Sequence, residues 1–168
     1  MALAAASALA NTYLPVKAIT EKIGVPGPAA GMALFGGLTF VFWVALAHQL
    51  TGKRYSAIAT AVLVASFCLL IRPWYGVLEP AWFSLYAIAA LFASGAIVEL
   101  AAFRSSVTTV LGGGLGNLAC LLITCLAIGL HTGSWVPAAA APLLAVAALL
   151  SGVVGAWLAR RAKPFSAG

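Results

Sequence analysis

The residues of this sequence best suited to binding a small molecule gather between two long apolar runs. The stretch RPWYGVLEPAW, residues 72–82, contains two Trp, a Tyr, a Glu and an Arg. Flat aromatic side chains stack on planar heterocycles, and a carboxylate pairs with a cationic or amine-bearing guest. Trp74, Tyr75 and Trp82 are therefore candidate stacking surfaces, with Glu79 as a polar anchor. The alternative is an interfacial belt, because Trp and Tyr are enriched where membrane helices meet lipid headgroups.

Helical spacing favours a pocket over a belt. Glu79, Trp82 and Tyr86 lie at positions i, i+3 and i+7, which places them on one stripe of a helix. This stripe carries polar character more than one turn into the membrane, whereas residues of an interfacial belt stay at the rim. Tyr86 is therefore a further candidate for ligand contact.

A second series of polar residues recurs at seven-residue steps. Asn117, Thr124 and His131 share one helix face, and polar groups in lipid usually face the bundle interior or a wet cavity. Asn117 fits ligand contact and interhelical hydrogen bonding equally well, and Thr124 is more typical of the latter. His131, at a helix end, is typical of a solvated or headgroup-contacting histidine. Trp135, in HTGSWVP, adds another candidate stacking surface.

Composition assigns the chain to the membrane. Hydrophobic residues make up 64% of the 168 positions and only three residues are acidic, so a water-soluble globule of this size would lack polar surface. The formal charge of +6 comes from scattered Lys and Arg that form no basic stripe. A nucleic-acid partner is therefore not expected.

Charges, prolines and Gly-Ser clusters divide the chain into six apolar segments. The continuous Ala- and Leu-rich runs exclude strand alternation, and a spanning helix needs roughly 20 apolar residues. We expect a single domain, residues 1–168, folded as an all-α integral membrane protein with a compact bundle of about six transmembrane helices. The segments are approximately 1–19, 28–50, 56–72, 81–103, 106–131 and 136–160.

The distribution of basic residues predicts orientation. With the amino terminus in the cytoplasm, six Lys and Arg lie inside and three outside, which agrees with the positive-inside rule. Both termini are then cytoplasmic in a multi-pass protein of the inner or plasma membrane. Ala8-Leu9-Ala10 resembles a signal-peptidase site, but no basic residue precedes it, so we expect the first segment to remain as a helix.

Glu99 falls near the cytoplasmic end of the fourth segment, five residues before Arg104. An ion pair with Arg104, or with Lys53 or Arg54 across the neighbouring loop, would neutralise it. The alternative role is docking of a cytoplasmic partner. His48, near the same face, is expected to be interfacial.

Small residues at four-residue spacing mark places where helices could approach closely in lipid. The pairs are Ala4 and Ala8, Ala6 and Ala10, Gly112 and Gly116, and Ser151 and Gly155.

Several kinds of chemistry are disfavoured. The sequence has no GxxxxGK[ST] run for nucleotide binding and no Asp for a Ser-His-Asp triad. Cys68, Cys120 and Cys125 lie inside apolar runs without CxxC spacing, which is typical of core residues. We expect neither enzymatic activity nor a bound cofactor or metal.

The segment Gly36–Leu50, then TGKRYSA, then GAIVELAAF followed by a basic residue and a Gly-rich helix, resembles a known family. It is similar to the substrate-binding S-components of energy-coupling factor (ECF) transporters, in particular the branch for thiamine or its hydroxymethylpyrimidine precursor. The resemblance implies capture of a vitamin-like molecule from outside, with uptake driven by a transmembrane coupling subunit and ATPase subunits. It also implies that Ala4 and Ala8, or Ala6 and Ala10, contact the coupling subunit, and that residues 13–26 form a lid.

This sequence departs from the family pattern in its short first helix and in the scarcity of acidic residues near the presumed site. The competing hypothesis is a non-catalytic accessory subunit of a larger membrane complex, in which the Ala and Gly faces pack against neighbours. A membrane enzyme is a third and more distant alternative.

Overall fold

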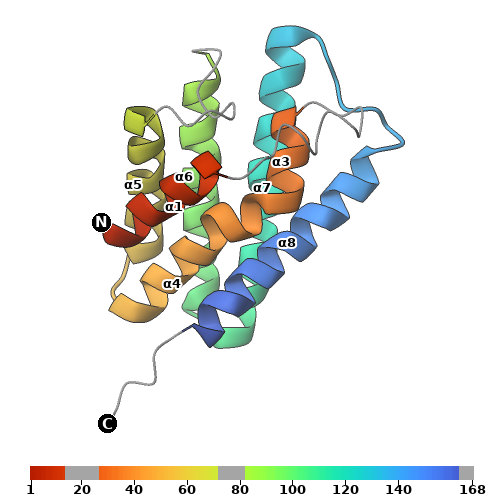
Figure 1. The fold of residues 1–168 in the computed structure, drawn as a ribbon. Coiled ribbons are helices and arrows are strands. Elements are labelled where there is room, and N and C mark those ends of the chain that lie inside the picture. Colours follow the sequence, from red (N-terminus) through yellow and green to blue (C-terminus); the bar gives the residue numbers. More distant parts are fainter. Residues whose placement is uncertain (14–26, 72–81, 163–168) are drawn as a thin grey trace.

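The structure is a computed structural model that describes residues 1–13, 27–71 and 82–162 (Figure 1). All the regular elements in these ranges are helices, and no strand occurs among them. The predicted all-α fold is therefore confirmed for the described residues. The elements are α1 (Ala2–Tyr13), α3 (Gly27–Gly36), the π-helix η1 (Gly37–Val41), α4 (Phe42–Thr51), α5 (Ser56–Ile71), α6 (Phe83–Ala102), α7 (Ser106–Thr132) and α8 (Ala141–Arg161).

Four helical spans among the described residues are long and apolar enough to cross a membrane. The first is continuous through α3, η1 and α4, and the other three correspond to α6, α7 and α8. Helix α1 has 12 residues and α5 has 16, which is fewer than the roughly 20 that a full crossing requires. The protein is thus an integral membrane protein by the length and composition of its helices.

Where the structure describes them, the predicted segment boundaries agree with the helices to within a few residues, except at the start of the last segment. The predicted end of the first segment, residue 19, lies outside the described residues. We predicted a start at residue 136, but α8 begins at Ala141. Residues 137–141 form a turn instead, in which the backbone N–H groups of Ala140 and Ala141 both donate to the Pro137 carbonyl oxygen. Proline in the first turn then starts α8, because the N–H that proline lacks would have no helical partner there.

The helices form two crossing layers. Figure 1 shows α5, α6 and α7 side by side, with α1, α4 and α8 crossing them obliquely. One buried apolar cluster joins α1, α4, α5, α6 and α8, and a second joins α3, α6, α7 and α8. Together they place the core between the two layers.

The crossing of η1 and α8 is a direct backbone contact. A Cβ atom on Gly37 would overlap the carbonyl oxygen of Ser151, and a Cβ on Gly155 would overlap the carbonyl oxygen of Gly37. Gly112 and Gly116 also lie close to α6, where an added Cβ would meet the side chains of Ala101 and Ser94. The small-residue pairs predicted in the fifth and sixth segments therefore do mark close helix approaches, which association in lipid depends on.

Two serines from neighbouring helices form hydrogen bonds to the backbone of the π-helix and of the turn before it. The Ser7 hydroxyl of α1 donates to the Thr39 carbonyl oxygen. The Ser151 hydroxyl of α8 accepts from the Gly37 N–H at 3.1 Å and donates to the Leu34 carbonyl oxygen at 2.9 Å. Backbone polar groups in a bilayer must be satisfied within the protein, so α1 and α8 stabilise this local departure from α-helical geometry.

Replacing Gly155 by leucine should destabilise the bundle, because α8 and η1 must separate to admit the side chain. We expect a loss of about 1–3 kcal/mol, as for other overpacked interiors. Thermal unfolding in detergent, followed by circular dichroism, measures the change. Val154→Leu is the matched control, because the Val154 side chain is 46% exposed on the same helix. Equal melting temperatures for the two variants would contradict the close crossing.

Candidate functional site

The structure describes four of the seven predicted ligand-binding residues. Trp82 immediately precedes α6, and Tyr86 lies one turn further on. Asn117 is in the middle of α7, and Trp135 is in the connection between α7 and α8. The other three, Trp74, Tyr75 and Glu79, lie outside the described residues, as does most of the predicted lid.

The start of α6 and the end of α7 together form a cluster of three rings, Trp82, Tyr86 and His131. The Trp82 ring stacks on the His131 imidazole with centroids 4.2 Å apart and an interplanar angle of 10°. The Tyr86 hydroxyl is hydrogen-bonded to His131 Nε2 at 3.0 Å, and the Tyr86 ring meets Trp82 edge-on at 6.4 Å. Because α6 and α7 are antiparallel neighbours, the two stripes predicted from the sequence meet at this end.

This cluster has the chemistry of a site for a planar guest. His131 is exposed, and Trp82 and Tyr86 are half-buried, so the rings are accessible. Either the tyrosine hydroxyl or the imidazole Nε2 donates the hydrogen bond between them, depending on the tautomer. In both cases the Nδ1 atom of His131 can form one further hydrogen bond, which lies in the plane of the imidazole ring.

Asn117 is fully buried and bonds to helix backbones. Its Nδ2 donates to the Ala148 carbonyl oxygen of α8 at 2.9 Å and to the Met32 carbonyl oxygen of α3 at 3.3 Å. Its Oδ1 lies against Gly36, so close that a Cβ there would overlap it. This geometry fits interhelical hydrogen bonding, one of the two roles expected from the sequence. Thr124, two turns along α7, is likewise buried.

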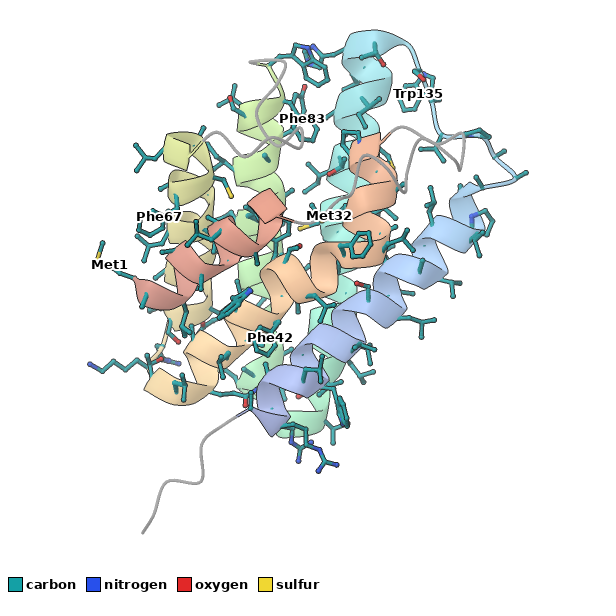
Figure 2. All side chains as sticks on the ribbon, viewed as in Figure 1. Met1, Met32, Phe42, Phe67, Phe83 and Trp135 are labelled. Carbon is teal, nitrogen blue, oxygen red and sulfur yellow. The ribbon has the colours of Figure 1, made fainter. Side chains whose placement is uncertain are left out.

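Trp135 does not join the ring cluster. Its side chain is 58% exposed, and its ring packs over Gly129 of α7, where a Cβ would collide with it. Figure 2 shows Trp135 and Phe83, the neighbour of Trp82, at the same end of the bundle. Among the described side chains, however, no ring contact connects Trp135 to Trp82.

His131 is the site residue that sequence reasoning underestimated. We expected a solvated or headgroup-contacting histidine, and the side chain is indeed exposed, but Trp82 and Tyr86 also hold its ring. The signal was present in the seven-residue spacing from Thr124, which directs His131 to the same face of α7. Only the pairing of α6 with α7 shows what that face meets.

At the opposite end of the bundle, Glu99 is 2% exposed and caps a neighbouring helix. Its two carboxylate oxygens accept from the backbone N–H groups of Tyr55 and Ala57, each at 2.8 Å. These groups belong to the first turn of α5 and the residue before it, where N–H donors lack helical partners and the helix dipole favours negative charge. The His48 Nδ1 atom lies 3.5 Å from Glu99 Oε2 and 3.0 Å from the Ser56 hydroxyl.

The predicted ion pair of Glu99 with Arg104, Lys53 or Arg54 is therefore wrong. All three basic side chains belong to exposed residues in the described loops, and the Arg54 guanidinium lies 5.3 Å from the centre of the Phe103 ring. The Glu99 carboxylate is buried between helices, where it contacts the backbone N–H groups at the start of α5. The long basic side chains extend to water instead.

The α4–α5 loop that Glu99 holds has an uncommon backbone. Tyr55 adopts a positive φ of 65°, which is sterically unfavourable for a residue with a side chain. Its N–H donates to Glu99, and this bond helps to fix that conformation.

The two predicted small-residue faces of α1 differ in accessibility. Ala4 and Ala8 are 1% and 0% exposed and pack in the chain's own core. Ala6 and Ala10 are half-buried. Of these two faces of α1, the one with Ala6 and Ala10 retains accessible surface.

Cys68, Cys120 and Cys125 are free thiols, and the first two are buried as expected of core residues. No group of three or more His, Cys, Asp or Glu side chains that could hold a metal occurs among the described residues.

Comparison with known proteins gives no relative: no protein-family model, curated protein or solved structure matches this chain. Function is therefore inferred from the residues and their geometry.

Replacing Glu99 by glutamine should destabilise the end of the bundle at which α5 begins. Glutamine replaces one of the two carboxylate oxygens with an NH₂ group, which cannot accept a hydrogen bond. One backbone N–H group, of Tyr55 or Ala57, then loses its acceptor, and a buried unsatisfied donor costs about 1–3 kcal/mol. Thermal unfolding and amide hydrogen exchange at Tyr55 and Ala57 measure the effect. Arg104→Gln should leave both unchanged. A comparable loss in Arg104→Gln would restore the ion pair that the sequence suggested.

Proposed function

We propose that this chain is the substrate-capture subunit of an ECF-type uptake transporter and binds a small planar vitamin or precursor at its extracytoplasmic face. The stacked arrangement of Trp82 on His131, hydrogen-bonded to Tyr86, is the observation that carries the proposal. Thiamine-like and pyrimidine compounds offer a flat ring and polar ring atoms that match it. The guest is bound and released unchanged, and the energy for uptake comes from the coupling and ATPase subunits.

The placement of charge supports an extracytoplasmic position for the ring cluster. Exposed basic residues of the described chain lie in the α4–α5 turn, in the α6–α7 turn and at the end of α8, all at the other end of the bundle (Figure 1). Under the positive-inside rule that end faces the cytoplasm. These residues are Lys53, Arg54, Arg104, Arg160 and Arg161.

The chain supplies further candidate contacts next to the cluster in sequence. Glu79 is three residues before Trp82, and Trp74 and Tyr75 precede it closely. In this proposal they add stacking surface and a negative charge for a cationic guest. Six helices, with both termini in the cytoplasm, then hold the site at the outer mouth of the bundle.

The second candidate is a non-catalytic accessory subunit of a larger membrane complex. It is favoured by Asn117, whose amide is bonded between α3 and α8 instead of facing a hollow. Purification from native membranes separates the two candidates. A complex that includes ATPase subunits supports capture, and a stoichiometric complex without any ATPase supports the accessory role.

Trp82→Ala should weaken binding of thiamine or hydroxymethylpyrimidine about tenfold, because stacking on an aromatic side chain contributes roughly 1–3 kcal/mol per ring. Isothermal titration calorimetry of the detergent-purified protein measures the affinity. Tyr86→Phe should cause a smaller loss, since only its hydroxyl contact with His131 is removed. Trp157→Ala is the matched control, because that ring lies at the far end of α8 beside Arg161. Equal affinities in the Trp82 and Trp157 variants would contradict a ligand site at the ring cluster.

A further inference from the structure

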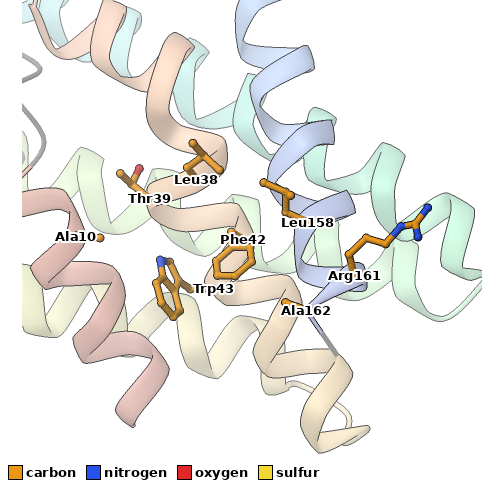
Figure 3. A pocket seen from close by; sticks show the side chains of 8 residues that line it. All are labelled: Ala10, Leu38, Thr39, Phe42, Trp43, Leu158, Arg161 and Ala162. Atoms are coloured by element: carbon orange, nitrogen blue, oxygen red, sulfur yellow. The ribbon is translucent and has the colours of Figure 1, made fainter. Parts of the chain in front are cut away.

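A groove of about 750 Å³ opens where α1, α4 and α8 cross, away from the ring cluster. Its volume is within the range of roughly 300–1,000 Å³ typical of pockets that bury a small ligand. In Figure 3, η1 and α4 form its floor, with α1 on one side and α8 on the other. The lining residues are Ala10, Leu38, Thr39, Phe42, Trp43, Leu158, Arg161 and Ala162.

The groove is apolar along most of its length. Leu38 is 45% exposed, and Phe42, Trp43 and Leu158 are half-buried. The Thr39 hydroxyl already donates to the Phe35 carbonyl oxygen at 2.9 Å, so its hydrogen is not available to a ligand. A surface of this kind in a membrane protein suits a hydrocarbon chain and not a polar metabolite.

Arg161 places a positive charge at one end of the groove. Arg161, in the last turn of α8, is exposed, and its guanidinium lies 5.2 Å from the centre of the Trp157 ring. Among the described residues no carboxylate lies within ion-pair distance of it. The ring contact restricts the guanidinium without neutralising it. A planar guanidinium binds phosphate oxygens through two parallel hydrogen bonds.

We propose that this groove binds an anionic phospholipid, with an acyl chain along Leu38, Phe42 and Leu158 and the headgroup phosphate on Arg161. Basic positions between membrane helices commonly bind anionic headgroups on the cytoplasmic side. Because α4 and α8 form part of the same groove, the bound lipid connects the two helices beside the η1–α8 crossing. The lipid stabilises the folded bundle because it binds only where these helices are packed together.

Native mass spectrometry of the detergent-purified chain tests this proposal. The probes are phosphatidylglycerol and phosphatidylcholine with identical acyl chains. We expect preferential retention of phosphatidylglycerol, and a five- to tenfold loss of its apparent affinity in Arg161→Gln. Arg161→Lys should retain part of the affinity because the charge remains.

Arg160→Gln is the matched control, since it removes the same charge from the adjacent residue, which does not line the groove. A much smaller loss in Arg160→Gln supports the site. Equal losses in the two variants, or equal retention of the two lipids in the wild type, would overturn it in favour of non-specific surface attraction.

A second pair of variants tests the groove itself. Leu158→Trp fills the cavity, whereas Leu150→Trp adds the same ring at a position 60% exposed on the same helix. Only Leu158→Trp should abolish the rise in melting temperature that phosphatidylglycerol causes. A rise that persists in Leu158→Trp, or a protein dimer that excludes the lipid, would refute the assignment. Vitamin binding is measured separately at the other end of the bundle, so either proposal can fail without the other.

Discussion

The contact on which the rest of this bundle depends is the backbone approach of η1 to α8. Gly37 and Gly155 have no room for a side chain, and the Ser151 hydroxyl serves both a donor and an acceptor of the α3–η1 segment. In lipid there is no water to expel from between helices, so contact of this kind and interhelical hydrogen bonds supply the association energy. The groove in which we place a phospholipid lies beside this contact, between α1, α4 and α8.

Buried polar groups elsewhere in the bundle are used in the same way. Asn117 bonds to carbonyl oxygens of two other helices, and Glu99 accepts from the free N–H groups at the start of α5. A carboxylate 2% exposed would be unfavourable without such donors, which offset the loss of water. The Asn117 Nδ2 group and the Glu99 carboxylate therefore hold helices together, whereas the Asn117 Oδ1 atom is buried without a hydrogen-bond partner. The accessible, stacked rings of Trp82 and His131 are the part of the described chain on which we base the proposed binding of a planar guest.

Sequence patterns predicted which residues share one face of a helix, but few of the contacts between helices. The stripe that contains Trp82 and Tyr86 and the series that ends at His131 follow from helical periodicity, because each concerns residues of one helix. The stacking of Trp82 on His131 required knowing that the start of α6 lies beside the end of α7. For Glu99 the sequence offered the nearby Arg104, since spacing reveals side chains but not the backbone donors of another helix. The hydrophobic pattern also did not predict the π-helix at Gly37–Val41.

The sequence by itself determined that the chain is helical, belongs in a membrane and breaks close to most of the observed helix ends. It could do so because the length of each apolar run, and the proline, glycine and charged residues that end it, are properties of neighbouring residues in the chain. Only the tertiary structure decided which faces meet: Ala4 and Ala8 turn into the core, Trp135 lies apart from Trp82, and Arg161 stands at the end of an apolar groove. These outcomes depend on how helices cross, and that is set by close contacts between residues distant in sequence.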